Sequence, residues 1–497
     1  MDDTWYTFFW ALTISLANFQ SGYSLNQVHQ VWNMTPCMYK FDPEIRNEVN
    51  TSAVTILPLV AAIVAPFTWW FALKLGKRRL LMCTSVIVIL ASCLKMFKSL
   101  TFLFLGRAIM GISTGVTSVL CPMFIYDITP IKWRGAFIGL MQVMINIGLV
   151  TGLSAGLTIP AFKINDEKEI DKYCGDDDND MRWRLVYIIP AFPAALHIIL
   201  MLFLFRSEIE YIKSNGGTPL LERDTNPQDG AQPNLRPEIR SGASSNSNFG
   251  RRVVFVESVK FEPYFQIFKK ENIRSISAGC FIHFLSQIAG VNMILQYSFY
   301  FTLKEEINQM NWRFVMGWLL LFASLISLIV VHFLKRKPIL LVGSLICCAC
   351  HVLLFQSYDD EKYHEDRDPE KLPTIFTLIV ITIFIIGYGL TIGTTTWVYS
   401  TEILTEQGMG LAVCVTWLSN FLIFWLRNFA IFIDPQYKSD QDLDRHTAIF
   451  LFVYSTVCLI SYFIIVVFIK ESGGRTREET NQIYKTTIYK PVSYLSD

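Results

Sequence analysis

Charged residues are scarce in this sequence. Of its 497 residues, 17% are Asp, Glu, Lys or Arg, whereas soluble globular proteins have about 25%. Hydrophobic residues make up 52% of the chain, and the mean hydropathy is +0.36. This composition excludes a disordered, fibrous or disulfide-framework protein. The formal net charge is only +1, so no basic excess indicates nucleic acid as a partner.

The sequence also lacks the motifs of cofactor, metal and nucleophile chemistry. We find no P-loop, no metal-ligand cluster and no nucleophile–base motif. The glycines between Gly106 and Gly115 are interpreted as a helix face rather than a phosphate loop. We therefore predict that the protein is not an enzyme and needs neither a cofactor nor a metal.

Few cysteines lie in polar loops, and the start of the sequence does not have the pattern of a cleaved signal peptide. Most of the eleven cysteines lie in apolar runs, where they behave as small hydrophobic residues, and only Cys37 and Cys174 lie in polar loops. The sequence leaves open whether these two form a disulfide. The start, Met1-Asp2-Asp3, has no basic region or small-residue cleavage site, so the first apolar run is expected to be a retained membrane helix.

Long apolar runs dominate what is present. A bilayer core of about 30 Å needs about 20 apolar residues in a helix, and runs of that kind recur along the chain. Twelve spans are predicted near 5–27, 51–73, 79–98, 101–126, 135–159, 185–205, 275–302, 314–334, 338–357, 373–401, 410–433 and 447–469. The sequence thus predicts an all-α membrane protein with twelve transmembrane helices.

Basic residues in short loops predict the orientation of these spans. Lys77 and Arg78 lie between spans two and three, Arg134 precedes span five, and Arg336 lies between spans eight and nine. Such loops usually face the cytoplasm, and an even number of spans then places both termini there as well. The sequon at Asn33 falls on the outer side and is a candidate glycosylation site.

The polar stretch near 206–274 divides the spans into two sets of six. Its centre is rich in Gly, Ser, Pro and Asn, so we expect it to be partly disordered. We predict an N-terminal six-helix bundle over 1–205, a cytoplasmic loop over 206–274, a C-terminal bundle over 275–470 and a cytoplasmic tail over 471–497. Paired six-span repeats are the plan of a large transporter class.

The stretch 106–135, GRAIMGISTGVTSVLCPMFIYDITPIKWRG, identifies a family resemblance. It is similar to the sugar-porter pattern of the major facilitator superfamily, with Phe124 and Asp127 in place of Tyr and Glu. Further motifs resemble that family in spans seven, ten and eleven and in the tail. They are Gln287 to Asn292, Trp397 with Glu402, Trp417 to Phe421, and Glu471 to Glu479.

The resemblance implies a set of substrate-binding residues. Amides both donate and accept hydrogen bonds, which suits a hydroxyl, and an aromatic face can cover a sugar ring. The implied residues are Gln142, Gln287, Asn292, Trp397 and Asn420. For each of them, interhelical packing is the alternative reading.

The resemblance also implies gating residues. Charges at the cytoplasmic span ends are expected to latch the two bundles together, and topology alone is the alternative. The expected latch residues are Arg78, Asp127, Arg134, Arg336 and Glu402. Arg107, which is costly to bury, is expected to pair with a carboxylate, and Tyr297 is a candidate outer gate.

Several departures from the pattern affect the second half. Ser286 replaces an amide, the Asn of span eight is replaced near Leu320, Gly389 stands in place of an acid, and Met409 in place of an Arg. Span ten also lacks its prolines, so we expect it to bend less easily.

No Asp or Glu lies in the middle of any span, and Ser24 stands where proton-driven relatives carry an Asp. The sequence therefore favours facilitated diffusion, with His197 and His283 as the remaining candidates for a proton relay.

Three functions remain open at this point. The leading one is a facilitative carrier for a hexose or similar polyol that works by alternating access. The others are a carrier for another small neutral solute, and a transport-inactive sensor or structural subunit of a larger membrane assembly. The plasma membrane is the expected location, with an internal membrane as the alternative.

Overall fold

The computed structural model describes residues 3–31, 46–157, 177–214, 269–297, 309–360, 372–433 and 440–485. Asn33, Cys37, Cys174 and most of the predicted 206–274 loop lie outside these ranges. Over the described ranges the secondary structure is helical, without strands. The elements are α1 (Asp3–Leu16), α2 (Phe19–Val31), α4 (Arg46–Val64), η3 (Ala65–Phe67), α5 (Thr68–Leu75), α6 (Lys77–Leu94), α7 (Leu100–Ile128), α8 (Arg134–Gly156), α10 (Asp177–Ile188), α11 (Ala191–Ser214), α12 (Lys270–Ile288), α13 (Val291–Tyr297), α14 (Gln309–Phe333), α15 (Arg336–Asp360), α16 (Leu372–Tyr388), η7 (Gly389–Gly393), α17 (Thr394–Ile403), α18 (Glu406–Ile433), α19 (Asp440–Phe468) and α20 (Arg477–Lys485).

Each predicted span corresponds to one of these helices or to two or three consecutive ones. Ten stretches of the described residues are long and apolar enough to cross a membrane. The other two predicted spans are α1 with α2, which are separated at Ala17 and Asn18, and α6, whose first turn is basic. The run lengths thus gave the right number of spans.

Five of the predicted spans are interrupted, and the breaks in spans two and six fall at η3 and between α10 and α11. The break between α1 and α2 falls in span one, and α12 ends before Gly290, which has a φ of 85°. In span ten, the π-helical turn η7 separates α16 from α17. The expected prolines are absent from this span, yet it departs from α-helical geometry where they would lie, and π-turns are known as sites of such irregularity.

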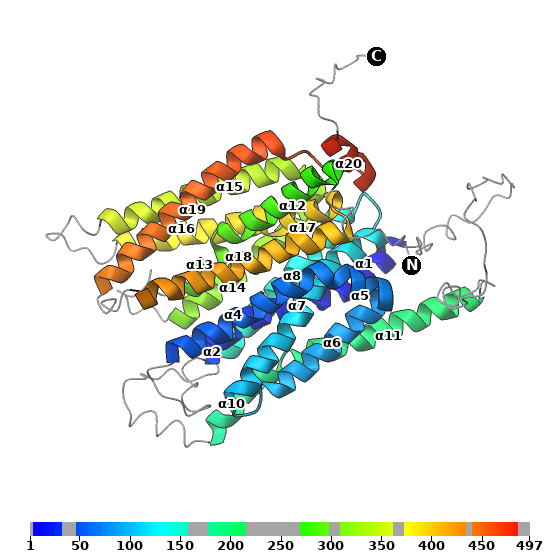
Figure 1. The fold of residues 1–497 in the computed structure, drawn as a ribbon, viewed down its shortest axis with the longest axis horizontal. Helices are drawn as coiled ribbons and strands as arrows, with labels where there is room; N and C mark the ends of the chain where they lie inside the picture. The colour runs from blue at the N-terminus through cyan, green and yellow to red at the C-terminus, as the bar shows by residue number, and fades with distance from the viewer. Residues whose placement is uncertain are drawn as a thin grey trace, which may run out of the picture.

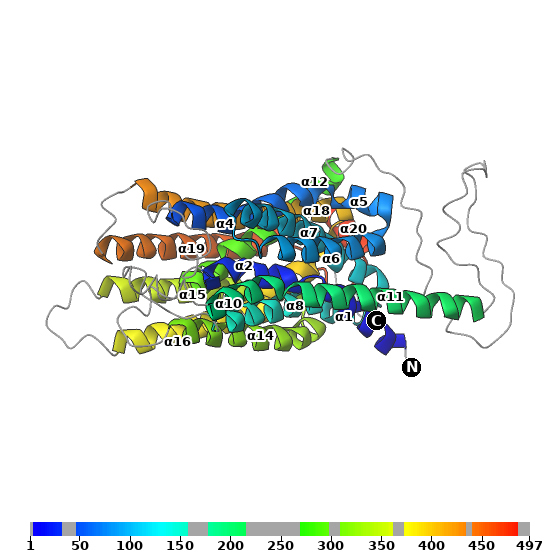
Figure 2. The ribbon, with the colours of Figure 1, turned by 90° about the horizontal axis from the view of Figure 1, so that it is seen from below.

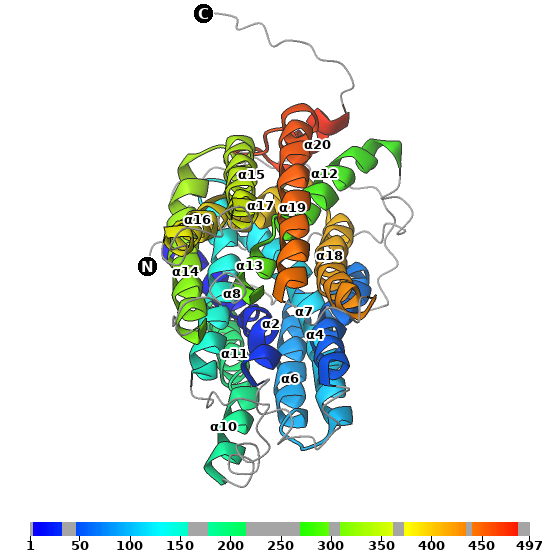
Figure 3. The ribbon, with the colours of Figure 1, turned by 90° about the vertical axis from the view of Figure 1, so that its left-hand side faces the viewer.

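The helices form two bundles that lie side by side. Figure 1 shows α1 to α11 in the lower half of the view and α12 to α20 in the upper half. Figure 2 shows that the long helices run roughly parallel, and Figure 3 again shows the C-terminal set mainly above the N-terminal set. Helix α8 packs on α14 and α4 packs on α18, and these pairs join the two bundles.

One end of the molecule carries α20, α5 and the start of α1 (Figure 1), and it is called the α20 end below. The last turns of α7 and α17 and the first turn of α18 meet there. Lys77, Arg134 and Arg336, which belong to the predicted cytoplasmic loops, lie at this end. The basic loops on which the predicted orientation rests are therefore on the same side.

Candidate functional site

Three of the predicted binding residues form an amide cluster in the C-terminal bundle. Gln287 Oε1 accepts hydrogen bonds from Asn292 Nδ2 at 3.0 Å and from Asn420 Nδ2 at 3.2 Å. Asn292 can reach back to Gln287 because Gly290 breaks the helix between them with a positive φ that favours glycine. The buried Asn420 Oδ1 has no partner among the described residues.

The other two predicted binding residues connect the bundles. Trp397 Nε1, from α17, donates to Gln142 Oε1, from α8, at 2.9 Å. Gln142 Nε2 donates to Asn146 Oδ1 at 3.2 Å, and Asn146 Nδ2 lies 3.4 Å from the carbonyl oxygen of Leu320 on α14. A chain of hydrogen bonds therefore runs from the C-terminal bundle through α8 and back.

His283 joins these two groups of residues. Its ring meets the ring of Trp397 edge-to-face at 5.1 Å, and its Nδ1 lies 2.6 Å from Thr416 Oγ1. Residues four positions apart lie on one face of a helix, so His283 and Gln287 on α12 face Thr416 and Asn420 on α18. The five predicted residues thus form two groups at neighbouring turns of α12 and α18.

These two groups have opposite hydrogen-bonding character. An indole N–H only donates and a backbone carbonyl only accepts, so the direction of the chain through Gln142 and Asn146 is fixed. Each of these two amides keeps a second N–H for another partner. In the C-terminal bundle, Asn420 Oδ1 is an acceptor without a partner in the described part of the chain. A group that both accepts and donates, such as a hydroxyl, is complementary to both sides.

A second tryptophan also crosses between the bundles. Trp417 Nε1, from α18, lies 3.3 Å from Ser118 Oγ on α7. The side chain of Tyr297, the predicted outer gate, lies outside the described residues.

Lys77 connects the bundles at the α20 end. It forms a 2.5 Å ion pair with Asp127 of α7 and a second ion pair with Glu406 of α18. Burial alone would lower the pKa of Lys77, but the carboxylates of Glu406 and Asp127 outweigh it and raise this pKa above its usual 10.5. Among the predicted latch residues, Asp127 therefore belongs to an ion-pair network that spans both bundles.

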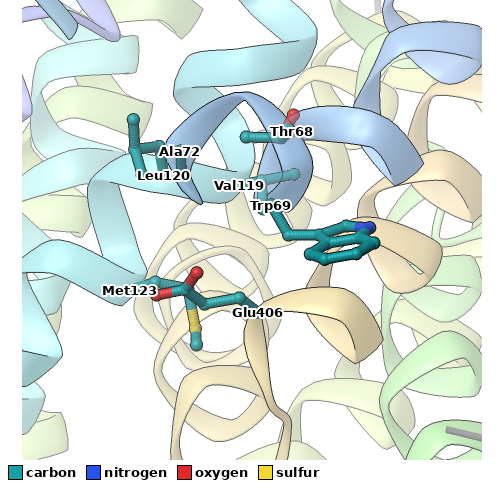
Figure 4. Close-up of a pocket in the computed structure, with 7 residues that line it drawn as sticks. All are labelled: Thr68, Trp69, Ala72, Val119, Leu120, Met123 and Glu406. Atoms are coloured by element: carbon teal, nitrogen blue, oxygen red, sulfur yellow. The ribbon is translucent and has the colours of Figure 1, made fainter. Parts of the chain in front are cut away.

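Mostly apolar side chains of the N-terminal bundle lie beside Glu406. Figure 4 shows a small pocket in which Glu406 lies near Trp69 of α5 and Met123 of α7. The first turn of α18 is thus held between two elements of the N-terminal bundle.

Arg336 and Glu402, two further predicted latch residues, pair within the C-terminal bundle. Arg336 Nη2 lies 2.8 Å from Glu402 Oε1, and both residues are buried. The tail closes over this pair, because Ser472 Oγ donates to Glu402 Oε2 at 2.6 Å and Glu471 accepts from the backbone N–H of Arg336. This arrangement fixes the tail to its own bundle.

The remaining predicted gating arginines make contacts within the N-terminal bundle. Arg78 donates to the carbonyl of Met201, and the Arg134 guanidinium lies 3.9 Å from the centre of the Tyr126 ring. Arg107 is fully buried and donates to the carbonyls of Ser24, Ala53 and Val54. A carboxylate partner was expected for Arg107.

The helix sequence gives a reason for this difference at Arg107. Pro58 has no N–H to donate to the carbonyl four residues earlier, so it leaves the Val54 oxygen available. The available carbonyl then accepts from Arg107 Nη2 at 3.3 Å.

The sequence reasoning did not select Lys77, Glu406 or Asn146 as functional residues. Glu406 lies four residues after Glu402, at the start of a span and on the same side as the basic loop that contains Lys77. This position was the one signal in the sequence that could have suggested an ion pair. Asn146 lies on the same helix face as Gln142, one turn away, which could have suggested their pairing. Among the described residues, no group of His, Cys, Asp or Glu could hold a metal ion.

Comparison with known proteins relates this geometry to a family. Residues 10–484 match the family described as "Sugar (and other) transporter". The chain is 22% identical to Sugar transporter ERD6-like 6 of Arabidopsis thaliana over 418 residues, which cover 83% of this chain and 77% of that one. It is 26% identical to the arabinose-proton symporter of Escherichia coli strain K12 over 391 residues, which cover 74% of each chain.

The fold is also similar to solved structures. The structure of the major facilitator superfamily proton:xylose symporter XylE bound to 6-bromo-6-deoxy-D-glucose aligns with a TM-score of 0.70 at 16% identity. The alignment covers 97% of this chain and 100% of the other. The inward-open structure of XylE from E. coli aligns with a TM-score of 0.62. This likeness confirms the predicted all-α, multi-pass membrane fold of twelve helices in two bundles.

Proposed function

Because the chain belongs to the sugar (and other) transporter family, we propose that it carries a hexose or a similar polyol across a membrane by alternating access. The observation that carries this proposal is the set of neutral amides contributed by both bundles. Gln142 offers an N–H donor from α8, whereas Asn420 on α18 offers an acceptor that has no partner among the described residues. A sugar hydroxyl can accept from one side and donate to the other.

The aromatic ring of Trp397 adds shape selectivity to this site. Its N–H donates to Gln142, and its ring packs edge-to-face with the ring of His283. These two contacts fix the orientation of the indole. A fixed aromatic face can cover the apolar C–H face of a sugar ring. The substrate would lie where the two bundles meet, and rocking of the bundles would expose it to either side in turn.

We further propose that transport is facilitated diffusion. A proton relay needs a titratable group inside the membrane, and no Asp or Glu lies in the middle of a span. The buried Arg107 is held by backbone carbonyls, and Ser24 contributes one of them. His197 bonds to Ser85 and His283 to Thr416, which fits polar packing between helices.

A proton gradient distinguishes this proposal from proton symport, which is the activity named for the arabinose-proton symporter and for XylE. Protein in liposomes should equilibrate labelled sugar at the same level with and without an inward proton gradient. Accumulation of sugar above the external concentration when the gradient is applied would contradict facilitated diffusion.

The α20 end is proposed to be the cytoplasmic side, with both termini there. Lys77, Arg134 and Arg336 lie at this end, and basic residues of short loops usually face the cytoplasm. Under this orientation Asn33 would be outside, as a plasma-membrane location requires of a glycosylation site. The domain boundaries at 205, 274 and 470 also stay predictions.

Uptake of labelled hexoses and polyols by purified protein in liposomes, without any ion gradient, tests the function. Saturable uptake is expected in the wild type, and Asn292→Ala should lose most of it, because Gln287 then loses one of its two donors. Asn481→Ala, which removes an amide from the tail helix α20 away from the site, is the control and should transport normally.

The result also decides between the alternatives. Uptake of a different neutral solute, again lost in Asn292→Ala, would replace the sugar but keep the site. No uptake of any neutral solute would favour a transport-inactive sensor or a structural subunit of a larger membrane assembly. Co-purified partners would then identify that assembly.

A further inference from the structure

Asn146 lies between the proposed substrate site and the opposite bundle. Its side chain is 2% exposed, and it contacts both Gln142 on its own helix and the backbone of Leu320 on α14. The Asn that the resembling pattern carries in span eight is replaced near Leu320. The amide of Asn146 contacts the backbone in this region from the other bundle.

The contacts of Asn146 fix the orientation of Gln142. The Trp397 indole can only donate, so Gln142 Oε1 must face it, and Nε2 must face Asn146. Asn146 can accept this bond through Oδ1 because its Nδ2 is directed at a carbonyl oxygen, which can only accept. Without Asn146, the inner N–H of Gln142 would have no acceptor at this position.

This orientation leaves the second N–H of Gln142 available for a ligand. Gln142 is half-buried, whereas Asn146 is almost completely enclosed, so Gln142 is the residue that can touch a substrate. We propose that Asn146 is a positioning residue that aims this N–H at one hydroxyl oxygen of the substrate and so contributes to selectivity among sugars. This inference rests on the proposed function.

A packing role would have different consequences. If Asn146 only filled space between α8 and α14, its loss would affect every substrate alike. If it positions Gln142, its loss should matter for sugars that carry the contacted hydroxyl and little for the analogue that lacks it. Hydroxyl-by-hydroxyl comparison therefore separates the two roles.

The experiment measures uptake of a hexose and its complete set of monodeoxy analogues by wild type and Asn146→Leu in liposomes. Leu has the same number and branching of side-chain heavy atoms as Asn but no hydrogen-bonding group. We expect the variant to raise KM for the parent hexose about tenfold, as loss of a well-oriented hydrogen bond does, with the maximal rate within about twofold. For one deoxy analogue, wild type and variant should have the same KM.

A control and a second variant keep the result interpretable. Thr151→Val removes a hydroxyl from the same helix, and among the described residues that hydroxyl bonds to the carbonyl of Ile147, so it should leave the KM values unchanged. Asn146→Ala carries the same test if Asn146→Leu does not fold, as judged by gel-filtration elution.

Each outcome has one meaning. A KM penalty confined to sugars with one particular hydroxyl supports the positioning role. Unchanged KM values, or an equal penalty for every analogue, overturn it while the carrier function stands. Absence of saturable uptake in the wild type removes the proposed function, and the inference with it.

Discussion

Trp397 makes one polar contact that connects the bundles at the proposed site, and this contact can be removed alone. Trp397→Phe keeps an aromatic ring but loses the N–H that donates to Gln142. A neutral hydrogen bond contributes about 1 kcal/mol, which corresponds to roughly fivefold in binding. We therefore expect KM for the sugar to rise about fivefold in uptake assays.

Trp312 offers a matched control for this change. Its buried indole N–H has no partner among the described residues, so Trp312→Phe removes the same atom without breaking a hydrogen bond. Equal effects of the two substitutions on KM would show that the contact between Trp397 and Gln142 has no role in binding.

Lys77 and Glu406 form the charged contact between bundles at the α20 end, and Glu406→Gln should weaken it. The Lys77 ammonium would keep Asp127 but lose its partner in the C-terminal bundle. We expect faster backbone hydrogen exchange in the last turn of α7 and the first turn of α18. Glu478→Gln, a charge removal in α20, is the control and should leave exchange in both turns unchanged.

The same ion pairs predict how this contact responds to pH. Because the pKa of Lys77 is raised above 10.5, the charged form and its stabilising effect are fully present below pH 10.5. They are lost only as the pH rises through the higher value in the folded protein. The rate of hydrogen exchange in these turns, corrected for its intrinsic pH dependence, should therefore show no transition due to Lys77 between pH 6 and 9. A transition in that range that disappears in Lys77→Met would contradict the raised pKa of Lys77.

At the scale of helices, close packing of α2 on α8 depends on glycine. A Cβ at Gly148 would lie 2.0 Å from the carbonyl oxygen of Phe19, which is backbone and cannot rotate away. Gly148→Ala should therefore force the helices apart, and overpacking of this kind typically costs about 1–3 kcal/mol. We expect a lower midpoint of thermal unfolding in detergent.

The next glycine of α8 provides the comparison. A Cβ at Gly152 would lie 3.4 Å from the carbonyl of Tyr23, an ordinary contact distance. Gly152→Ala should be tolerated, and the idea of close packing fails if both substitutions lower the midpoint equally.

The helices also show what the sequence could predict and what it could not. Bilayer thickness sets the length of an apolar run, so the apolar runs predict where the spans lie, and ten of the twelve are long and apolar enough in the described residues. The break at Gly290 and the π-turn Gly389–Gly393 leave hydropathy unchanged, and they were not predicted as such.

The site residues divide in a similar way. Gln287 and Asn292 belong to one local motif, which the family resemblance identifies. Asn146 and Leu320 are 174 positions apart, and Glu406 meets Lys77 only because the bundles are assembled. Neither contact has a local pattern, because tertiary packing alone brings these residues together.

For the whole molecule, alternating access requires that contacts at the α20 end break while each bundle stays intact. The tail segment 471–485 is fixed to the C-terminal bundle by Ser472 at Glu402 and by Tyr484, which hydrogen-bonds Tyr399. Arg477 reaches beyond that bundle. Its guanidinium donates to the Thr401 carbonyl of α17 and lies 4.2 Å from the centre of the Tyr126 ring of α7.

Arg477→Ala should therefore favour opening at the α20 end. A cation over an aromatic ring contributes about 0.5–1 kcal/mol at partly exposed sites, and the backbone N–H of residue 477 can still donate to Tyr126. We expect a two- to fivefold rise in the open-to-closed ratio, measured as the long-distance population between genetically encoded spin labels at the exposed positions Ile131 and Leu334. Arg475→Ala is the matched control, because the Arg475 side chain bonds to the tail's own Glu471 carbonyl. If both variants give the wild-type distance distribution, the tail does not hold the bundles together, and Lys77 with Glu406 remains the contact to test.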